Sequence, residues 1–320
     1  MKFFRRLAEE IGGGNAVVVA TVVEAKGSVP REIGAKMIVC PDGRIFETIG
    51  GGAGEAKVIQ AAGEVFKSRA RSLVEVDLTG VEERQTEGIC GGIMRISLEL
   101  WQGAASLSLA EVILSQLESG KSIRLATPIN YQGAPFLLPD KQAIPAGVFV
   151  EILQPLPTLL IVGAGHVAIE LAKIAEICGF EIAVQDDRSD WANTKNYPKA
   201  AKIFTQTIAE TVAHFADNEN FYAALLTRAY KYDLEALKEL LKGKPVCRYI
   251  GMIGSEKRVR KVVRAIEESG IEKERLASLH APIGLDIGAL TPAEIAVSIA
   301  AELIKIRRGG TGQSLSIYCK

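Results

Sequence analysis

A glycine-rich turn near the middle of the chain has the residue types and spacing of a phosphate-binding loop. Residues 159–162 are apolar, and residues 163–168 read Gly-Ala-Gly-His-Val-Ala, a G-x-G-x-x-A pattern that opens an apolar helix. Gly163 permits a tight turn, Gly165 lets a pyrophosphate approach the backbone, and the start of the helix attracts negative charge. Asp186, 23 positions after Gly163, stands where a carboxylate binds ribose hydroxyls. The pattern predicts a nucleotide-type ligand; the alternative is that the glycines serve packing alone.

Two further side chains, His166 and Arg188, bear on which nucleotide would bind. His166 lies inside the phosphate-type turn, where it either contacts the ligand or has a structural role. Arg188 follows the expected ribose carboxylate by two positions, and an arginine there accommodates the 2′-phosphate of NADP, unless it is a solvated surface residue. NAD and NADP are therefore both compatible with the turn.

A second glycine run precedes a predicted helix in the first part of the chain. Gly50, Gly51 and Gly52 lead into a helix that carries Glu55, and unobstructed N–H groups at a helix start bind anions. The alternative is a flexible turn in which Glu55 complements the helix dipole. Ser28 and Arg31 lie at a predicted strand end, where arginine suits bidentate phosphate contact, unless it is a solvated surface residue.

Cys90 is the cysteine whose surroundings suggest chemistry. It precedes Gly91 and Gly92, which would let a bulky ligand come close, and its thiolate suits a soft metal or a sulfur ligand. The alternative is that this cysteine packs as a small hydrophobic residue. The five cysteines are widely separated and form no C-x-x-C pair, which argues against a disulfide framework and a zinc site.

Polar residues near the C-terminal end of the chain add candidates. Gly254 and Ser255 open a helix, so their N–H groups offer an anion site, or Ser255 is simply a cap. His280 and Asp286 fall in an aperiodic loop of the kind that lines the crevice at the carboxyl ends of parallel strands. The alternative for His280 is a hydrogen-bonded core histidine.

The elements that would position these residues indicate an α/β protein. Residues 1–102 predict an α+β domain in which 35–40 and 44–48 form a hairpin and 54–69 a helix. Residues 103–157 are rich in proline and predict a connecting segment with hairpins. From 158 to 320 strands alternate with helices, which predicts a Rossmann-like, doubly wound parallel sheet.

The composition excludes several kinds of partner. With 38 basic and 38 acidic residues the chain has no net charge, so neither nucleic acid nor an acidic lipid surface is an expected partner. No apolar run is long enough to span a membrane, and an acidic pair and glycines interrupt any signal-peptide core near the N-terminus. The expected location is the cytoplasm.

Several runs resemble one known family, that of the xanthine dehydrogenase accessory proteins, XdhC/CoxI. Residues 20–31, 34–37, 50–55 and 90–92 resemble its N-terminal domain. Residues 251–258, 280–288 and 291–299 resemble its Rossmann domain. The resemblance implies a factor that binds the molybdenum cofactor (molybdopterin) and shields it while a separate sulfurase exchanges a terminal ligand for sulfur. It also implies insertion of the cofactor into a molybdenum hydroxylase client, and makes Cys90 a candidate molybdenum or sulfur contact.

One departure from the family pattern and two alternative functions accompany this resemblance. Tyr230 lies in the segment where relatives commonly carry a histidine, so no role of that histidine transfers to this chain. An NAD(P)-dependent oxidoreductase is the alternative function, although only His166, His214 and His280 are available as histidine acid–base groups. A sulfur-handling enzyme using Cys90 would need an activated thiolate. We expect a homodimer.

Overall fold

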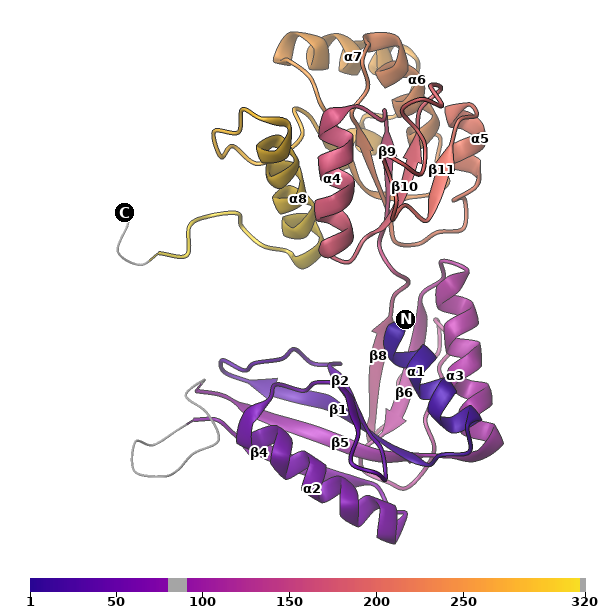
Figure 1. Cartoon of the computed structure of the whole chain (residues 1–320), viewed down its shortest axis with the longest axis vertical. Coiled ribbons are helices and arrows are strands. Elements are labelled where there is room, and N and C mark those ends of the chain that lie inside the picture. The colour runs from indigo at the N-terminus through magenta and orange to yellow at the C-terminus, as the bar shows by residue number, and fades with distance from the viewer. Residues whose placement is uncertain (80–90, 317–320) are drawn as a thin grey trace. The chain divides into compact units, whose positions relative to one another are not determined.

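The computed structural model describes residues 1–79 and 91–316, with Lys273 described in its backbone only. The chain forms two compact units (Figure 1). Unit 1 comprises Met1–Glu118 and Ser122–Gln154, and unit 2 comprises Ser119–Lys121 and Pro155–Lys320. The prediction of a Rossmann-like parallel sheet together with an α+β domain is confirmed.

Unit 1 is built on a five-stranded antiparallel sheet of order β3-β2-β1-β5-β4. Alternate residues of β1 point to opposite faces, so Val18 and Ala20 pack beneath α2 while Val17 and Val19 pack against α1 and α3. The predicted hairpin is the antiparallel pair β2–β3. The elements are α1 (Lys2–Gly12), β1 (Val17–Lys26), β2 (Lys36–Val39), β3 (Ile45–Glu47), α2 (Gly52–Ser68), β4 (Ser72–Asp77) and β5 (Ile93–Trp101).

Residues 103–157, which we expected to connect the domains, contribute mainly to unit 1. They form α3 (Gly103–Glu118) and a three-stranded antiparallel sheet of order β7-β6-β8, made of β6 (Ile123–Pro128), β7 (Phe136–Leu137) and β8 (Val148–Leu153). Leu125 of β6 and Ile113 of α3 belong to the same buried cluster as Phe4 and Leu7 of α1. Proline marks the turns of this sheet, while its apolar strands complete the core.

Unit 2 is a six-stranded parallel sheet of order β11-β10-β9-β12-β13-β14. Helices α4 and α8 cover one face and α5, α6 and α7 the other, so β9 is buried on both sides and is apolar after its first residue, Thr158. The strands are β9 (Thr158–Val162), β10 (Glu181–Gln185), β11 (Lys202–Phe204), β12 (Phe221–Leu225), β13 (Cys247–Met252) and β14 (Leu279–His280). The helices are α4 (His166–Ile177), α5 (Ile208–Ala213), α6 (Tyr230–Leu241), α7 (Glu256–Glu268), the short 3₁₀ helix η1 (Lys273–Ser278) and α8 (Pro292–Arg308).

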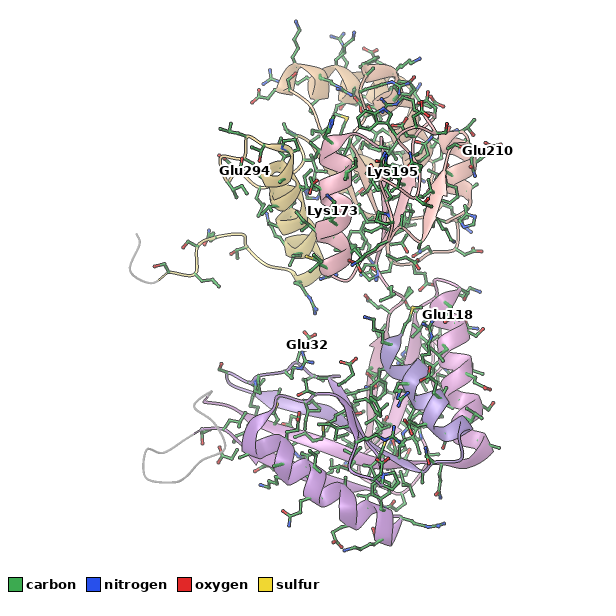
Figure 2. The ribbon with its side chains drawn as sticks, in the orientation of Figure 1. Glu32, Glu118, Lys173, Lys195, Glu210 and Glu294 are labelled. Atoms are coloured by element: carbon green, nitrogen blue, oxygen red, sulfur yellow. The ribbon has the colours of Figure 1, made fainter. Side chains whose placement is uncertain are left out.

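Capping fixes where α8 begins. The Thr291 hydroxyl accepts a hydrogen bond from the Glu294 amide, while the Glu294 carboxylate accepts one from the Thr291 amide, and Pro292 occupies the first turn. Glu294 is labelled at this end of the helix in Figure 2. These reciprocal bonds satisfy two amides that a helix start leaves unpaired.

Candidate functional site

The predicted phosphate-type turn joins β9 to α4 at the carboxyl end of the parallel sheet. Gly163 has φ of +98°, and a Cβ there would lie 2.5 Å from the carbonyl oxygen of Leu226, so both conformation and space require glycine. A Cβ on Gly165 would meet no atom within 4 Å. The backbone at the second glycine is therefore not covered by other described atoms of the protein.

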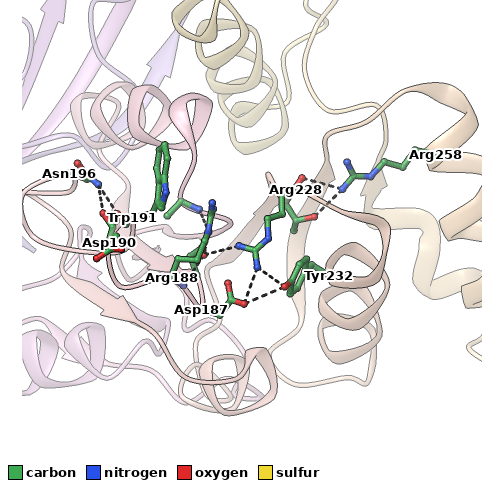
Figure 3. Close-up of polar contacts among 11 residues, drawn as sticks. Asp187, Arg188, Asp190, Trp191, Asn196, Arg228, Tyr232 and Arg258 are labelled. Atoms are coloured by element: carbon green, nitrogen blue, oxygen red, sulfur yellow. Dashed lines mark hydrogen bonds and ion pairs between the residues drawn. The ribbon is translucent and has the colours of Figure 1, made fainter.

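Trp191 and Arg188 form an aromatic and cationic surface beside this turn (Figure 3). His166, the first residue of α4, is exposed, and its ring meets the Trp191 ring edge-on at 5.2 Å between centroids. The Arg188 guanidinium lies over the same indole, 5.2 Å from its centroid. Trp191 thus contacts both His166 at the start of α4 and Arg188 in the loop after β10. The sequence analysis did not include Trp191 among the residues of the site.

Asp186 is placed at the end of β10, as expected, but its carboxylate is engaged within the protein. Its Oδ2 accepts hydrogen bonds from the Ala164 amide (2.8 Å) and from Arg188 Nη2 (2.8 Å). Its Oδ1 accepts from the amide and the Nε of Arg188 at 3.0 and 2.9 Å. An ionised carboxylate offers about four acceptor positions, so these four bonds use its capacity.

The electrostatics of Asp186 follow from the same contacts. The side chain is only 5% exposed, and burial by itself disfavours its charge. The hydrogen bonds from Arg188 and from the Ala164 amide outweigh burial and hold the pKa of Asp186 well below its usual value. The carboxylate is therefore ionised at neutral pH and fixes both the turn and the arginine.

A second charged network crosses from β10 to β12. Arg228 Nη2 donates to Asp187 Oδ2 at 3.0 Å and to the Tyr232 hydroxyl at 2.5 Å, and Tyr232 donates to Asp187 at 3.3 Å (Figure 3). The sequence analysis did not assign Arg228 or Tyr232 to the site. Their position directly after a parallel strand was the available signal, because such ends meet at one edge of the sheet.

A buried carboxylate ties the turns after β12 and β13 together. Asp233 is fully buried and accepts hydrogen bonds from the Thr227 hydroxyl and from Arg258 Nε, both at 2.6 Å. Burial raises the pKa of Asp233, against the opposing effect of these two bonds. Gly254 and Ser255 lie at this point, where the Ser255 hydroxyl accepts a hydrogen bond from the Arg258 amide and so caps α7.

Tyr230, in the segment where relatives commonly carry histidine, is the first residue of α6. Its ring packs against the core beneath α6, and Lys261 Nζ lies 4.6 Å from the ring centroid. Its neighbours in the network above, Arg228 and Tyr232, are the residues of this segment that face Asp187.

A cavity of about 270 Å³ adjoins the turn. Its walls come from the carboxyl ends of β9, β10, β11 and β12 and from the first turns of α5 and α6. Gly163, Asp186, Asp187 and Arg228 all line it, whereas His280 and Asp286 do not. The cavity is therefore lined by residues of the loops after β9 and β10 and by the charged network after β12.

His280 lies instead in a cluster with α8. Its ring stacks on Tyr249 at 4.7 Å between centroids, and its Nδ1 is 3.4 Å from Glu302 Oε1. Glu302 Oε2 also accepts hydrogen bonds from the Tyr249 hydroxyl (2.6 Å) and from the Gly284 amide (2.9 Å). These contacts match the structural alternative for His280, while Asp286 is exposed on the following loop.

In unit 1 the structure brings the predicted motifs to one place. A Cβ on Gly92 would lie 2.4 Å from the carbonyl oxygen of Ser28, and one on Gly50 would lie 2.6 Å from Pro30. Arg31 Nε donates to the Thr48 carbonyl at 3.2 Å. The loops 26–31, 48–52 and 91–92 therefore pack together. Cys90, the candidate molybdenum or sulfur contact, lies outside the described residues.

The glycine turn of unit 1 already holds a protein carboxylate. Gly50, Gly51 and Gly52 have positive φ values of 142°, 79° and 67°. Glu55 Oε2 accepts hydrogen bonds from the Thr48 hydroxyl (2.5 Å), the Ile49 amide (3.3 Å) and the Gly51 amide (3.2 Å). Glu55 thus occupies part of the anion-binding concavity that the glycine run predicts.

Two general properties concern only the part of the chain that the structure describes. Within residues 1–79 and 91–316, no group of three or more His, Cys, Asp or Glu side chains is arranged to hold a metal ion. No helix in the same ranges is long and apolar enough to cross a membrane. Cys40, Cys178 and Cys247 are free thiols.

The sheet order, the glycine turn and the residues after each strand define a Rossmann-type domain joined to an α+β domain. Residues 159–303 match the model of the XdhC Rossmann domain, and residues 11–77 match that of the XdhC and CoxI family. The chain belongs to the XdhC and CoxI family.

Named relatives agree with this assignment. The chain is 27% identical to a Bacillus subtilis protein named as a probable subunit of xanthine dehydrogenase, over 91% of this chain and 93% of that protein. It is 25% identical to the molybdenum cofactor insertion chaperone PaoD of Escherichia coli, over 95% and 87% respectively. It is also 28% identical to the uncharacterized protein YqeB of Escherichia coli, and spans only 44% of the length of that relative.

A solved structure shares the whole architecture. The crystal structure described as a xanthine dehydrogenase from Bacillus halodurans matches with a TM-score of 0.78 and 25% sequence identity, over 98% of both chains. The relatives are thus named as an insertion chaperone and as part of a dehydrogenase.

Proposed function

We propose that this protein binds the molybdenum cofactor, shields it while a separate sulfurase exchanges its terminal ligand for sulfur, and assists its insertion into a molybdenum hydroxylase of the xanthine dehydrogenase type. The relatives named as a probable xanthine dehydrogenase subunit and as a molybdenum cofactor insertion chaperone support the proposal. In this chain the main observation in favour of the proposal is the open backbone at Gly165. It lies next to the rings of His166 and Trp191 and the guanidinium of Arg188.

The described residues fit one part of the cofactor. Its phosphate would lie on the amides of the β9–α4 turn, at the start of α4, since nothing would meet a Cβ at Gly165. The Arg188 guanidinium, paired with Asp186, lies beside the turn, and Trp191 and His166 supply aromatic surface for a flat heterocycle. The bound group supplies the metal and its exchangeable ligand, while these residues hold and orient it.

The resemblance to the family makes Cys90 the candidate for a direct protein contact to molybdenum. Burial raises the pKa of the Cys40 and Cys247 thiols. A low thiolate content makes these two poor ligands for a soft metal. We expect Cys90→Ala to weaken retention of the cofactor while the fold is retained.

The test is a binding measurement with released cofactor. The protein is incubated with cofactor released from a molybdenum enzyme and, separately, with NADH or NADPH, then desalted and assayed for molybdenum and pterin. We expect retained cofactor and no retained nicotinamide. Gly165→Ala should reduce affinity about tenfold or more, because the added methyl group occupies the phosphate approach. Gly63→Ala is the matched control, since a Cβ there also meets nothing within 4 Å but lies on α2.

The contrary outcome would favour the alternative enzyme. Tight binding of NADH or NADPH together with substrate-dependent loss of its absorbance would overturn the maturation role. Among the described histidines, His214 lies within hydrogen-bonding distance of Lys202 and packs against two phenylalanine rings. His280 lies beside Glu302. His166 at the turn is therefore the histidine available as an acid–base group for such an enzyme. The homodimer and the sulfurase remain predictions, which light scattering and co-purification would test.

A further inference from the structure

The last helix of unit 2, α8, is apolar even on the side that remains at the surface. Its core side is buried in the cluster that also contains α4. The surface side, here called the outer face of α8, carries four apolar residues at helical spacing: Ala293, Val297, Ala301 and Ile304. Val297 is 47% exposed. A surface helix ordinarily carries polar residues on its solvent side, whereas a helix that is apolar all round is covered on all sides.

The apolar surface continues into the loop before α8. Leu290 precedes the N-cap Thr291, at the position from which an apolar side chain often packs against the fourth helical residue. That residue, Ile295, packs against the core instead, and Leu290 is 87% exposed. Ile287 in the same loop is 53% exposed. Several exposed apolar residues around one helix mark an interaction surface, whereas a single one such as Ile177 is ordinary.

The C-terminal arm, residues 309–316, leaves the other end of α8. Every residue of the arm is exposed. Near its start the arm passes two side chains of unit 2, because a Cβ on Gly312 would lie 3.4 Å from Lys305 and 3.5 Å from Leu285. Beyond that point the arm runs away from the body of unit 2 (Figure 1), and Leu315 is 96% exposed. The arm therefore presents an apolar side chain that unit 2 of the same chain does not cover.

The two ends of the outer face carry opposite charges. Glu294 in the first turn is exposed, and it caps the helix through Oε2 alone. Lys305 in the last turn forms no hydrogen bond or ion pair with any described residue. Two such helices that lie side by side in opposite directions would place each carboxylate next to the ammonium of the other helix. The antiparallel helix dipoles would favour the same direction.

We propose that the outer face of α8 binds a second copy of this chain, with the two α8 helices antiparallel across a twofold axis. Three contacts then share one centre near residue 299: Val297 with Ala301, Glu294 with Lys305, and Leu290 with Gly309, where the arm of the other copy begins. A twofold axis requires the same patch to be complementary to itself, and these pairs meet that requirement. This symmetry favours a second copy over an unrelated partner.

The arm completes the interface in this arrangement. Since Leu290 of one copy is level with Gly309 of the other, each arm starts beside the exposed loop before the partner helix. Leu315 lies six residues further on, within reach of about 20 Å in an extended chain. It covers Leu290 and Ile287 of the second copy. The inference goes beyond the proposed function, because it names the surface of the expected homodimer and needs no cofactor.

The test measures the molar mass of the full-length protein by sedimentation equilibrium over a range of concentrations. We expect a dimer that dissociates on dilution. Val297→Glu places two like charges near the axis and should raise the dissociation constant about a hundredfold or more. The fold should be retained, because Val297 is half-exposed, and calorimetric melting of the variant checks this. Ile177→Glu is the matched control, since Ile177 is 80% exposed at the end of α4 and lies off the outer face of α8.

Two further variants test the direction of the helices and the position of the arm. Lys305→Glu should weaken the dimer about tenfold at low salt and less at about 1 M salt, where the repulsion from Glu294 is screened. Leu315→Ser should weaken it about tenfold at any salt concentration. An unchanged dissociation constant for Lys305→Glu would overturn the antiparallel pairing, and one for Leu315→Ser would overturn the position of the arm. A protein that is monomeric throughout, or a dimer weakened equally by Val297→Glu and Ile177→Glu, would overturn the whole inference and leave the maturation role untouched.

Discussion

The buried ion pair between Lys36 and Glu151 gives the sharpest prediction about the architecture of unit 1. Lys36 Nζ lies 2.6 Å from both carboxylate oxygens of Glu151 and 3.2 Å from the Gly34 carbonyl, and both charged side chains are only 9% exposed. Glu151 belongs to β8 and Lys36 to β2, so the pair joins the three-stranded sheet to the five-stranded one. It is therefore a structural link inside one of the motifs that resemble the family.

The magnitude follows from what Glu151→Leu leaves behind. The ammonium keeps one acceptor, the Gly34 carbonyl, and stays buried without its counter-charge, which costs about 3–5 kcal/mol. Replacing both partners, as in Lys36→Met with Glu151→Leu, removes the uncompensated charge and should cost less than about 1 kcal/mol. Burial lowers the pKa of Lys36, so the cost of the single variant should shrink as the pH rises and the amine loses its proton.

The assay uses the placement of the two tryptophans. Trp101 is buried in unit 1 and Trp191 lies in unit 2, so fluorescence in a Trp191→Phe background follows urea unfolding of unit 1 alone. Equal destabilisation by the single and the double variant, or a loss below about 0.5 kcal/mol for Glu151→Leu, would refute the reasoning. The second result would also contradict a unit 1 that includes residues 122–154.

Three shorter predictions concern unit 2. Gly163→Ala should lower the melting temperature, because the new Cβ would lie 2.5 Å from a backbone oxygen, whereas Gly165→Ala should leave it unchanged and affect ligand binding only; calorimetry distinguishes them. The pKa of Asp186 is lowered in the folded state, so its contribution to stability is present above the unfolded value of about 3.9 and is lost as the pH falls below it. In urea unfolding, the free energy of unfolding of Asp186→Asn should therefore be lower than that of the native protein at pH 7, and this difference should become smaller below about pH 4. Tyr249→Phe removes a hydrogen bond to the buried Glu302 carboxylate and should cost about 1.5–3 kcal/mol in chemical denaturation, with cofactor retention unchanged.

The sequence predicted those features of the fold that depend on neighbouring residues. The alternation of apolar strands and helices after residue 158 is a local pattern, and the parallel sheet follows from it. The glycine requirement at Gly163 is likewise local. Residues 103–157 were harder to assign, because proline obscures short strands whose apolar faces are completed by α1 and α3, distant in sequence.

The candidate site was predictable in position but not in its internal contacts. Asp186 stands at the expected strand end, yet the return of the Arg188 side chain onto it depends on the loop conformation. The contact of Arg228 with Asp187 spans 41 positions, and only the sheet order brings the two together. Periodicity within a segment carries no information about pairs of this kind.

The two glycine turns share a feature that bears on how a carrier would work. The Ala164 amide of one turn donates to Asp186, and the Gly51 amide of the other donates to Glu55, so each turn is anchored by a carboxylate of the chain itself. Backbone amides that the protein satisfies internally do not need a ligand to keep the turn folded. A turn ordered in advance lowers the conformational cost of binding, and it also remains ordered when the ligand leaves. For a protein proposed to pass its cargo to a client, this arrangement allows release without local unfolding.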